Sequence, residues 1–216
     1  IVSYSVVDMS LFGNALFPAP ALGNLEASKN VAIPGLTNRS EAMIVLPHAN
    51  GSDFWLITQQ VSSQSYSVTL INAATYPAGP FTTTTTTGLG LPMTADHFAW
   101  HAGKKKLAVA SQTSNVDAIV LTFDDATGAL AFDRYIFNSA VITTNNQAIY
   151  DIEWSLNGDY LYYSVFGDAG VAGNVLQFDY NTPANSLTSI LPSTVFRSYG
   201  LQMAPDSAIY HLYQAS

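Results

Sequence analysis

Asp151 and Glu153 form the acidic pair whose spacing could serve a reaction. They flank Ile152 in a segment that we predict to be a β-strand, so both side chains point to one face, roughly 6 to 7 Å apart. Paired carboxylates can act as the acid and base of glycoside hydrolysis or hold Ca²⁺. The same alternation is typical of a solvent-facing row on a strand that buries Ile152 and Trp154, so both interpretations stay open.

Aromatic side chains on two predicted strands could stack on sugars. They are Tyr160, Tyr162 and Tyr163 on one strand, and Tyr210, His211 and Tyr213 on the other. Because residues two apart share a face of a strand, Tyr160 and Tyr162 lie opposite Leu161 and Tyr163. Packing between repeated units explains the same pattern. The candidate ligand-facing residues are therefore Asp151, Glu153, Tyr160 and Tyr162.

His97 and His101 have the spacing that places two zinc ligands on one face of a helix. Here they fall on a predicted strand that runs into a turn, where four residues span about 13 Å, too far for one metal ion. Residues 50–53 and 124–128 resemble calcium loops but lack the alternating acidic spacing and the distal Glu, so we interpret both as turns. The chain has no Cys. We therefore predict no metal site, no cofactor and no catalytic residue.

The composition excludes some partners. Only 10% of the residues are charged, and the net charge is −8 with seven Lys and Arg, three of them at Lys104, Lys105 and Lys106. Nucleic-acid binding needs a basic stripe, which this sequence lacks, and the acidity also disfavours docking on anionic lipids. The sequence has no apolar run of about 18 residues, so we predict no membrane-spanning helix.

Two strand motifs recur along the chain. In the first, an apolar strand, a polar turn and a second apolar strand follow one another, and its anchors are Leu46, Trp100, Trp154 and Met203, spaced 54, 54 and 49 residues apart. From Trp100, Trp154 and Met203, a step of seven residues leads to an apolar residue of the second strand. The other motif is an alternating strand that ends in Asp or Asn, at residues 4–8, 67–72, 119–124 and 175–179.

A period near 50 with about four short strands is typical of β-propeller blades. We therefore predict an all-β chain of about four four-stranded antiparallel blades. We also predict that residues 1–216 form a single, partial propeller domain that belongs to a six- to eight-bladed ring. We expect surface loops at residues 82–87 and 138–147. Because the chain begins at Ile1 without Met, we also expect a removed leader or a piece of a longer protein.

The motifs resemble the propeller domains of large secreted surface proteins that gliding bacteria export by the type IX system. The resemblance is carried by residues 4–10, 29–31, 46–58, 173–179 and 198–206. The family's usual Ser-Pro-Asp-Gly turn is replaced at residues 101–104 and 155–158. The earlier part of the propeller and the C-terminal sorting domain are also missing, which favours an excised module. The resemblance implies export, display outside the cell, and adhesion or motility, and it supplies no catalytic residue.

Two modification patterns occur. Asp206-Ser207-Ala208 fits the O-glycosylation pattern that such exported proteins carry, which makes Ser207 a candidate. Asn38 and Asn50 fit the N-linked acceptor pattern, relevant only in a host with that pathway.

The sequence therefore predicts a non-catalytic extracellular or cell-surface module for adhesion, surface-layer scaffolding or gliding-type motility. Its expected partners are other domains of the same long chain, other surface proteins or glycans. A lectin-like propeller and a propeller polysaccharide lyase or glycosidase are the alternatives, and fold class alone does not separate them.

Overall fold

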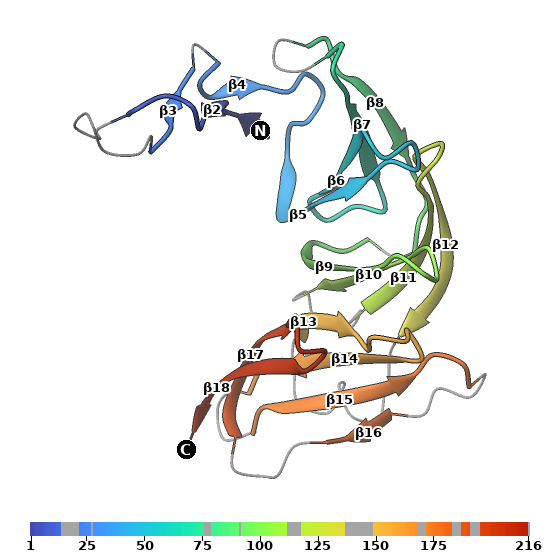
Figure 1. Cartoon of the computed structure of the whole chain (residues 1–216). Coiled ribbons are helices and arrows are strands. Elements are labelled where there is room, and N and C mark those ends of the chain that lie inside the picture. Colours follow the sequence, from blue (N-terminus) through green and yellow to red (C-terminus); the bar gives the residue numbers. More distant parts are fainter. Residues whose placement is uncertain are drawn as a thin grey trace.

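The computed structural model describes residues 1–13, 22–26, 28–75, 79–90, 92–111, 118–136, 149–167, 172–182, 187–190 and 195–215. Every regular element in these residues is a β-strand. The sheets follow one another along an open arc (Figure 1). This part of the chain has no helix with the length and apolarity that crossing a membrane needs. The predicted all-β propeller architecture is confirmed.

Three complete blades form the middle of the arc, and each has four antiparallel strands in sequence order. The first blade contains β5 (Arg39–Pro47), β6 (Phe54–Gln60), β7 (Tyr66–Ile71) and β8 (Thr82–Thr86). The second contains β9 (Ala95–His101), β10 (Lys106–Ser111), β11 (Ala118–Asp124) and β12 (Ala129–Ile136). The third contains β13 (Ile149–Trp154), β14 (Tyr160–Val165), β15 (Asn174–Asp179) and β16 (Leu187–Ser189).

A two-stranded sheet lies beyond the third blade, and a narrow hairpin precedes the first. At the C-terminal end, β17 (Val195–Met203) pairs with β18 (Ile209–Ala215). At the N-terminal end, β1 (Ser3–Tyr4) pairs with β4 (Val31–Ala32), and β2 (Val7–Asp8) pairs with β3 (Asn24–Leu25). The fourth set of repeat anchors thus lies in a two-stranded sheet.

The register of the strands explains the repeated step of seven residues. Trp100 lies opposite Leu107, and Trp154 lies opposite Leu161, so the step joins cross-strand partners in the second and third blades. In the C-terminal sheet, Met203 lies opposite Ile209. The step of seven from Met203 therefore overshoots its partner by one residue.

The loop that we expected at residues 82–87 is wrong for most of its length, because residues 82–86 form β8. Thr is β-branched and suits a strand. The hydroxyl of Thr83 lies 2.8 Å from that of Thr69, and the hydroxyl of Thr85 lies 2.7 Å from that of Ser67. These cross-strand hydrogen bonds fix β8 at the outer edge of the first blade. The loop expected at 138–147 lies outside the described residues.

Apolar side chains fill the space between neighbouring blades. In β10, Leu107 and Val109 belong to the cluster between the first and second blades, whereas Ala108 and Ala110 belong to the cluster between the second and third. The small alanines lie on the side where the third blade contributes large rings such as that of Tyr163. Because both faces are buried, β10 is a continuous apolar run and does not alternate.

Gly128 brings the turn between β11 and β12 against the first blade. Its φ is +75°, and a Cβ atom at this position would lie 2.9 Å from the ring of Trp55. The indole N–H of Trp55 donates a 2.8 Å hydrogen bond to the carbonyl of Asp125 in the same turn. Both the backbone conformation and the contact therefore require glycine.

Gly128→Ala is expected to destabilise the chain through both effects. The left-handed backbone costs about 1 to 2 kcal/mol for a residue with a Cβ atom, and the crowded contact adds about 1 to 3 kcal/mol. The free energy of unfolding in urea measures the sum. Gly51→Ala is the matched control, because Gly51 has the same φ of +75° with nothing near the Cβ position. Equal losses in the two variants would show that the Trp55 contact contributes nothing.

The three consecutive lysines make ion pairs with three different carboxylates. Lys104, Lys105 and Lys106 pair with Asp159, Asp125 and Asp133, respectively. Asp133 also accepts a 2.8 Å hydrogen bond from the hydroxyl of Tyr180, which follows the third blade's strand β15. The ion pair between Lys104 and Asp159 and the hydrogen bond between Tyr180 and Asp133 therefore join the second blade to the third.

Asp133 is expected to stabilise this junction in a pH-dependent way. Burial raises its pKa, but hydrogen bonds from Lys106, Tyr180 and Arg134 outweigh burial, so the net pKa lies below the usual value. A carboxyl group with a lowered pKa stabilises the fold above its unfolded-state pKa of about 3.9, and this contribution is lost as the pH falls through the folded-state value. Asp133→Asn should therefore lower the free energy of unfolding near pH 7 by about 1 to 3 kcal/mol, with a smaller difference at pH 3.

Urea unfolding at both pH values measures the effect, and Glu41→Gln, on an exposed carboxylate of β5, is the control. A difference between wild type and Asp133→Asn that stays constant from pH 7 to pH 3 would contradict the assignment.

Candidate binding site on the inner strands

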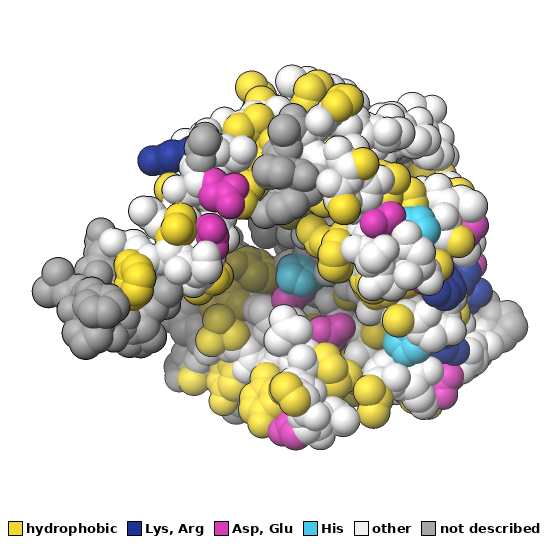
Figure 2. Space-filling model, turned by 45° about the horizontal axis from the view of Figure 1, so that its top comes forward, with side chains coloured by type: hydrophobic (Ala, Val, Ile, Leu, Met, Phe, Trp, Pro, Cys, Tyr) yellow, Lys and Arg dark blue, Asp and Glu magenta, His cyan; other side chains and the backbone are white. Residues whose placement is uncertain are grey.

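The first strand of each blade lies on the concave side of the arc. Here β5, β9, β13 and β17 contact one another in that order (Figure 1). They line a cavity of about 700 Å³. Its lining includes all four repeat anchors, namely Leu46, Trp100, Trp154 and Met203. Figure 2 shows one face of the molecule hollowed, with histidine and acidic side chains beside the hollow.

Asp151 holds three inner strands together. Its side chain is buried. Oδ1 accepts a 2.7 Å hydrogen bond from the amide of Ile152 and lies 3.1 Å from Nε2 of His97 on β9. Oδ2 accepts a 2.7 Å hydrogen bond from the amide of Leu201 on β17. One carboxylate on β13 therefore connects the inner strands on both sides of it.

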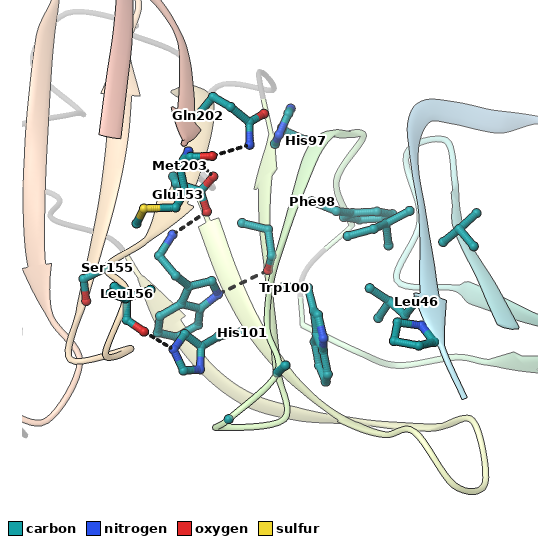
Figure 3. Close-up of a pocket in the computed structure, with 17 residues that line it drawn as sticks. Leu46, His97, Phe98, Trp100, His101, Glu153, Ser155, Leu156, Gln202 and Met203 are labelled. Carbon is teal, nitrogen blue, oxygen red and sulfur yellow. Dashed lines mark hydrogen bonds between the residues drawn. The ribbon is translucent and has the colours of Figure 1, made fainter. Parts of the chain in front are cut away.

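Glu153 makes a second connection to β17. Its Oε2 accepts a 3.0 Å hydrogen bond from the amide of Met203, and its Oε1 accepts a 2.9 Å hydrogen bond from the amide of Trp154. In Figure 3, Glu153 lies beside Met203 and Gln202, with His97 close by and Leu46 across the pocket. The two acidic side chains thus accept hydrogen bonds from alternate backbone amides of β17, the next inner strand.

The sequence prediction for this pair is confirmed in part. Asp151 and Glu153 both point towards β17, and Ile152 and Trp154 are buried, as the alternation predicts. A solvent-facing row is wrong for Asp151, because β17 and β9 cover its carboxylate. The sequence of one strand contains no information on which strand packs against it.

Burial raises the pKa of Asp151, while the His97 imidazole and the amides of Leu201 and Ile152 act in the opposite direction, with a net rise. The buried environment therefore disfavours the charged carboxylate. A group with a raised folded-state pKa stabilises the fold fully below its unfolded-state pKa and loses this contribution as the pH rises through the folded-state value. The contribution of Asp151 to stability thus decreases as the pH rises, whereas that of Asp133 decreases as the pH falls.

His97 is the partner that sequence reasoning missed, since we considered it only as a metal ligand. A signal was present in the repeat: His97 lies three residues before the anchor Trp100, and Asp151 lies three residues before the anchor Trp154. Equivalent positions on neighbouring inner strands therefore hold a base and an acid.

His101 makes separate contacts at the end of β9. Its Nδ1 accepts a 3.1 Å hydrogen bond from the amide of Lys104, so Nε2 carries the proton and donates a 3.2 Å hydrogen bond to the carbonyl of Leu156. The described residues contain no group of three or more His, Asp or Glu side chains placed to hold a metal ion.

Both calcium-like segments are turns. The carboxylate of Asp124 accepts hydrogen bonds from the amide of Ala126 and the hydroxyl of Thr127. The side-chain oxygen of Asn50 accepts from the amides of Ser52 and Asp53. These are the local bonds that stabilise Asx turns.

The tyrosines divide between the faces of β14 as the alternation predicts. Tyr163 and Leu161 are buried, whereas Tyr160 and Tyr162 are half-buried on the opposite face. Tyr162 lies opposite Glu153 in the neighbouring strand. It also lines a cavity of about 350 Å³ to which β17 and β18 contribute. Glu153 and Tyr162 are therefore brought together, at a junction between sheets.

Ser207 is exposed in the turn between β17 and β18. Its φ is +67°, and its amide donates a 2.9 Å hydrogen bond to the carbonyl of Ala204. Asn38 also has a positive φ, of +53°. O-glycosylation of Ser207 stays a prediction.

The fold and the inner strands define an open arc of β-propeller blades. No protein-family model matches the sequence, and no curated protein sequence matches it. The solved structures that are similar to the chain include two with TM-scores above 0.5. One, from Bacteroides uniformis ATCC 8492, is provisionally assigned as a 6-phosphogluconolactonase; its TM-score is 0.56 at 16% identity, over 89% of this chain and 53% of that one.

The other is the β-propeller domain of Cps50 (Swd1) from Myceliophteria thermophila, with a TM-score of 0.52 at 11% identity, over 93% of this chain and 57% of that one. The chain therefore spans little more than half the length of these structures. At such low identity the likeness shows the fold alone.

Asp151→Asn is expected to loosen the junction between β13 and β17. The amide side chain keeps one acceptor and places an NH₂ donor where an acceptor is needed, so one of the amides of Ile152 and Leu201 loses its partner. We expect a loss of about 1 to 3 kcal/mol in the free energy of unfolding, and a larger loss at pH 3 than at pH 7, because burial disfavours the charged carboxylate of Asp151. Faster hydrogen exchange at Leu201 should accompany the loss.

Glu41→Gln again serves as the control, because its carboxylate is exposed on β5. Unchanged exchange at Leu201 in the Asp151 variant would show that this carboxylate does not hold β17.

Proposed function

We propose that this chain is a non-catalytic propeller module that acts by binding, in adhesion or scaffolding outside the cell. The observation that carries the proposal is the engagement of the acidic pair. Each of the four carboxylate oxygens of Asp151 and Glu153 is accounted for: three accept an amide hydrogen bond, and Oδ1 of Asp151 accepts one and also contacts His97. Groups used in this way hold blades together and are poorly placed to exchange protons with a substrate.

The extracellular location rests on the resemblance to type IX-exported surface proteins, whose propellers accompany adhesive repeats. Because only 10% of the residues are charged, we expect the surface to bind its partners mainly through hydrogen bonds and apolar contacts. Gliding-type motility is a second role of the same family. The partners that fit this role are other domains of the same long chain, other surface proteins and glycans.

A lectin-like role is the second candidate, and Tyr162 favours it. This half-buried ring lines the cavity of about 350 Å³ together with His211, Leu201 and Ile209. A sugar ring stacks well on an aromatic face with polar groups at its edge. A polysaccharide lyase or glycosidase would instead need a free acid and base at the inner strands.

The proposal predicts binding without turnover. Beads coated with the purified chain should adhere to intact cells of the native source more than beads coated with albumin. The chain should release no new reducing ends or unsaturated sugars from alginate, pectin or chitin. Protease added to intact native cells should digest the protein, as expected for display outside the cell.

Three variants separate the candidates. If Tyr162→Ala abolishes binding on a glycan array while Tyr160→Ala, on the same face of β14, retains it, the lectin-like role replaces adhesion through protein partners. Turnover of a polysaccharide that Asp151→Asn eliminates, in a variant that remains folded, would overturn the non-catalytic proposal.

A further inference from the structure

Three aromatic side chains meet where the third blade contacts β17, and we call them the aromatic cluster. Tyr150 lies on β13, Phe166 follows β14, and Tyr199 lies on β17. The ring centroid of Tyr199 is 5.4 Å from that of Tyr150 and 5.6 Å from that of Phe166, and the centroids of Tyr150 and Phe166 are 6.4 Å apart. All three side chains are at least partly exposed, and Tyr150 is 38% exposed.

The repeat of the blades does not require the two tyrosines. Tyr150 and Tyr199 occupy equivalent positions, because each lies four residues before the repeat anchor of its strand. The other two inner strands have Ala42 and Asp96 at this position. Blades of this chain therefore form without an aromatic residue here, and the tyrosine pair is a feature of one junction.

Phe166 departs from the repeat in the same way. It lies five residues after Leu161, the cross-strand partner of the anchor in the third blade. The corresponding residue of the first blade is Gln60, five residues after Trp55. All three rings of the aromatic cluster thus stand at positions where another blade has a small or polar side chain.

β-Bulges set the direction of the tyrosine side chains. The pairing of β13 with β14 shifts around Tyr150, and the pairing of β17 with β18 shifts around Tyr199. The pairing of β9 with β10 shifts in the same way around Asp96, so the bulge belongs to the repeat whereas the rings do not. A bulge bends the strand and re-aims a side chain, and bulges are over-represented beside functional sites.

The hydroxyls of both tyrosines are available to a ligand. In the part of the chain that the structure describes, neither the hydroxyl of Tyr150 nor that of Tyr199 forms a hydrogen bond with another residue. By contrast, the hydroxyl of Tyr180 donates a 2.8 Å hydrogen bond to Asp133 within the fold. The aromatic cluster therefore combines flat apolar rings with two hydroxyls that the fold does not use.

Arg197 packs against the third ring of the cluster. Its guanidinium lies over the ring of Phe166, 5.2 Å from the centroid, and 5.3 Å from the centroid of Phe196. Such cation–π contacts stabilise the position of a ring. Phe166 therefore supports the cluster, and Tyr150, the most exposed of its three rings, presents the surface on which a ligand can stack.

A sugar matches this combination of a flat ring and unused hydroxyls. In a β-linked pyranose of the glucose type, one face carries axial C–H groups that pack on an aromatic ring, and the equatorial hydroxyls lie at the rim, where a tyrosine hydroxyl can bond to them. The net charge of −8 repels a polyanionic glycan. A neutral glycan therefore fits better than an acidic one.

We propose that the aromatic cluster binds a neutral β-linked glycan, with one sugar ring stacked on Tyr150 and its hydroxyls bonded to those of Tyr150 and Tyr199. The inference rests on the binding role proposed above and names the ligand class. It adds a site apart from the cavity beside Tyr162, because none of the three rings of the cluster lines that cavity.

Isothermal titration calorimetry of the purified chain tests the site, with cellohexaose, N-acetylchitohexaose and xylohexaose as the neutral probes. We expect at least one of them to bind. Tyr150→Ala should weaken its binding by about tenfold through the loss of a stacking contact. Tyr150→Leu, which keeps apolar bulk without a flat ring, should do the same. Tyr150→Phe, which removes only the hydroxyl, should weaken binding by about threefold.

Tyr160→Ala is the control, because Tyr160 is a partly exposed tyrosine on β14 outside the cluster. It should bind as the wild type does, and circular dichroism should show every variant folded. Equal affinity of the wild type and Tyr150→Leu, or no binding of any neutral probe, would overturn the site. Binding of hexagalacturonate alone would overturn the neutral class. A loss in Tyr162→Ala but not in Tyr150→Ala would place the sugar in the other cavity.

The adhesion of coated beads to native cells distinguishes failure of this site from failure of the proposed function. A chain that binds none of the sugars but still adheres would overturn the glycan site and leave the binding role in place. A chain that neither binds the sugars nor adheres would contradict both.

Discussion

Burial of both faces of each blade is the constraint on which this structure depends. A four-stranded sheet with apolar side chains on both faces is stable only between two neighbours. Exposing one face to water would lower the free energy of unfolding by about 25 cal/mol for each Å² of apolar surface. The second blade meets this need with unequal faces: Leu107 and Val109 point one way, and Ala108 and Ala110 the other. At the last junction of the arc, the carboxylates of Asp151 and Glu153 then fix β17 against β13. The place of each blade along the arc is set by its contacts with its neighbours.

Much of the architecture could be predicted because blades repeat. The anchors Trp100 and Trp154 fall opposite Leu107 and Leu161, so the recurring step of seven residues reflects cross-strand pairing. The threonine run misled the prediction for a physical reason. A low-complexity sequence is typical of loops. In β8, however, the β-branched threonines favour a strand, and their hydroxyls form hydrogen bonds with the neighbouring strand β7.

The candidate site was less accessible to sequence reasoning. Alternation placed Asp151 and Glu153 on one face, but it could not show that β17 covers this face, because the covering strand lies about 50 residues away. The role of His97 depends on the same long-range packing. Acidic spacing alone is compatible with catalysis, ion binding and structure, and only the partner atoms distinguish these roles.

The carboxylates of Asp151 and Glu153 bind the main-chain amides of Leu201 and Met203, and not their side chains. Every residue except proline offers the same N–H group at the same place. The inner strand of a following blade can therefore diverge in its side chains while it keeps its docking geometry. Met203 can therefore stand at the anchor position of β17 without a change in the bond that docks this strand, and the concave surface there is free to acquire new specificities without loss of the architecture.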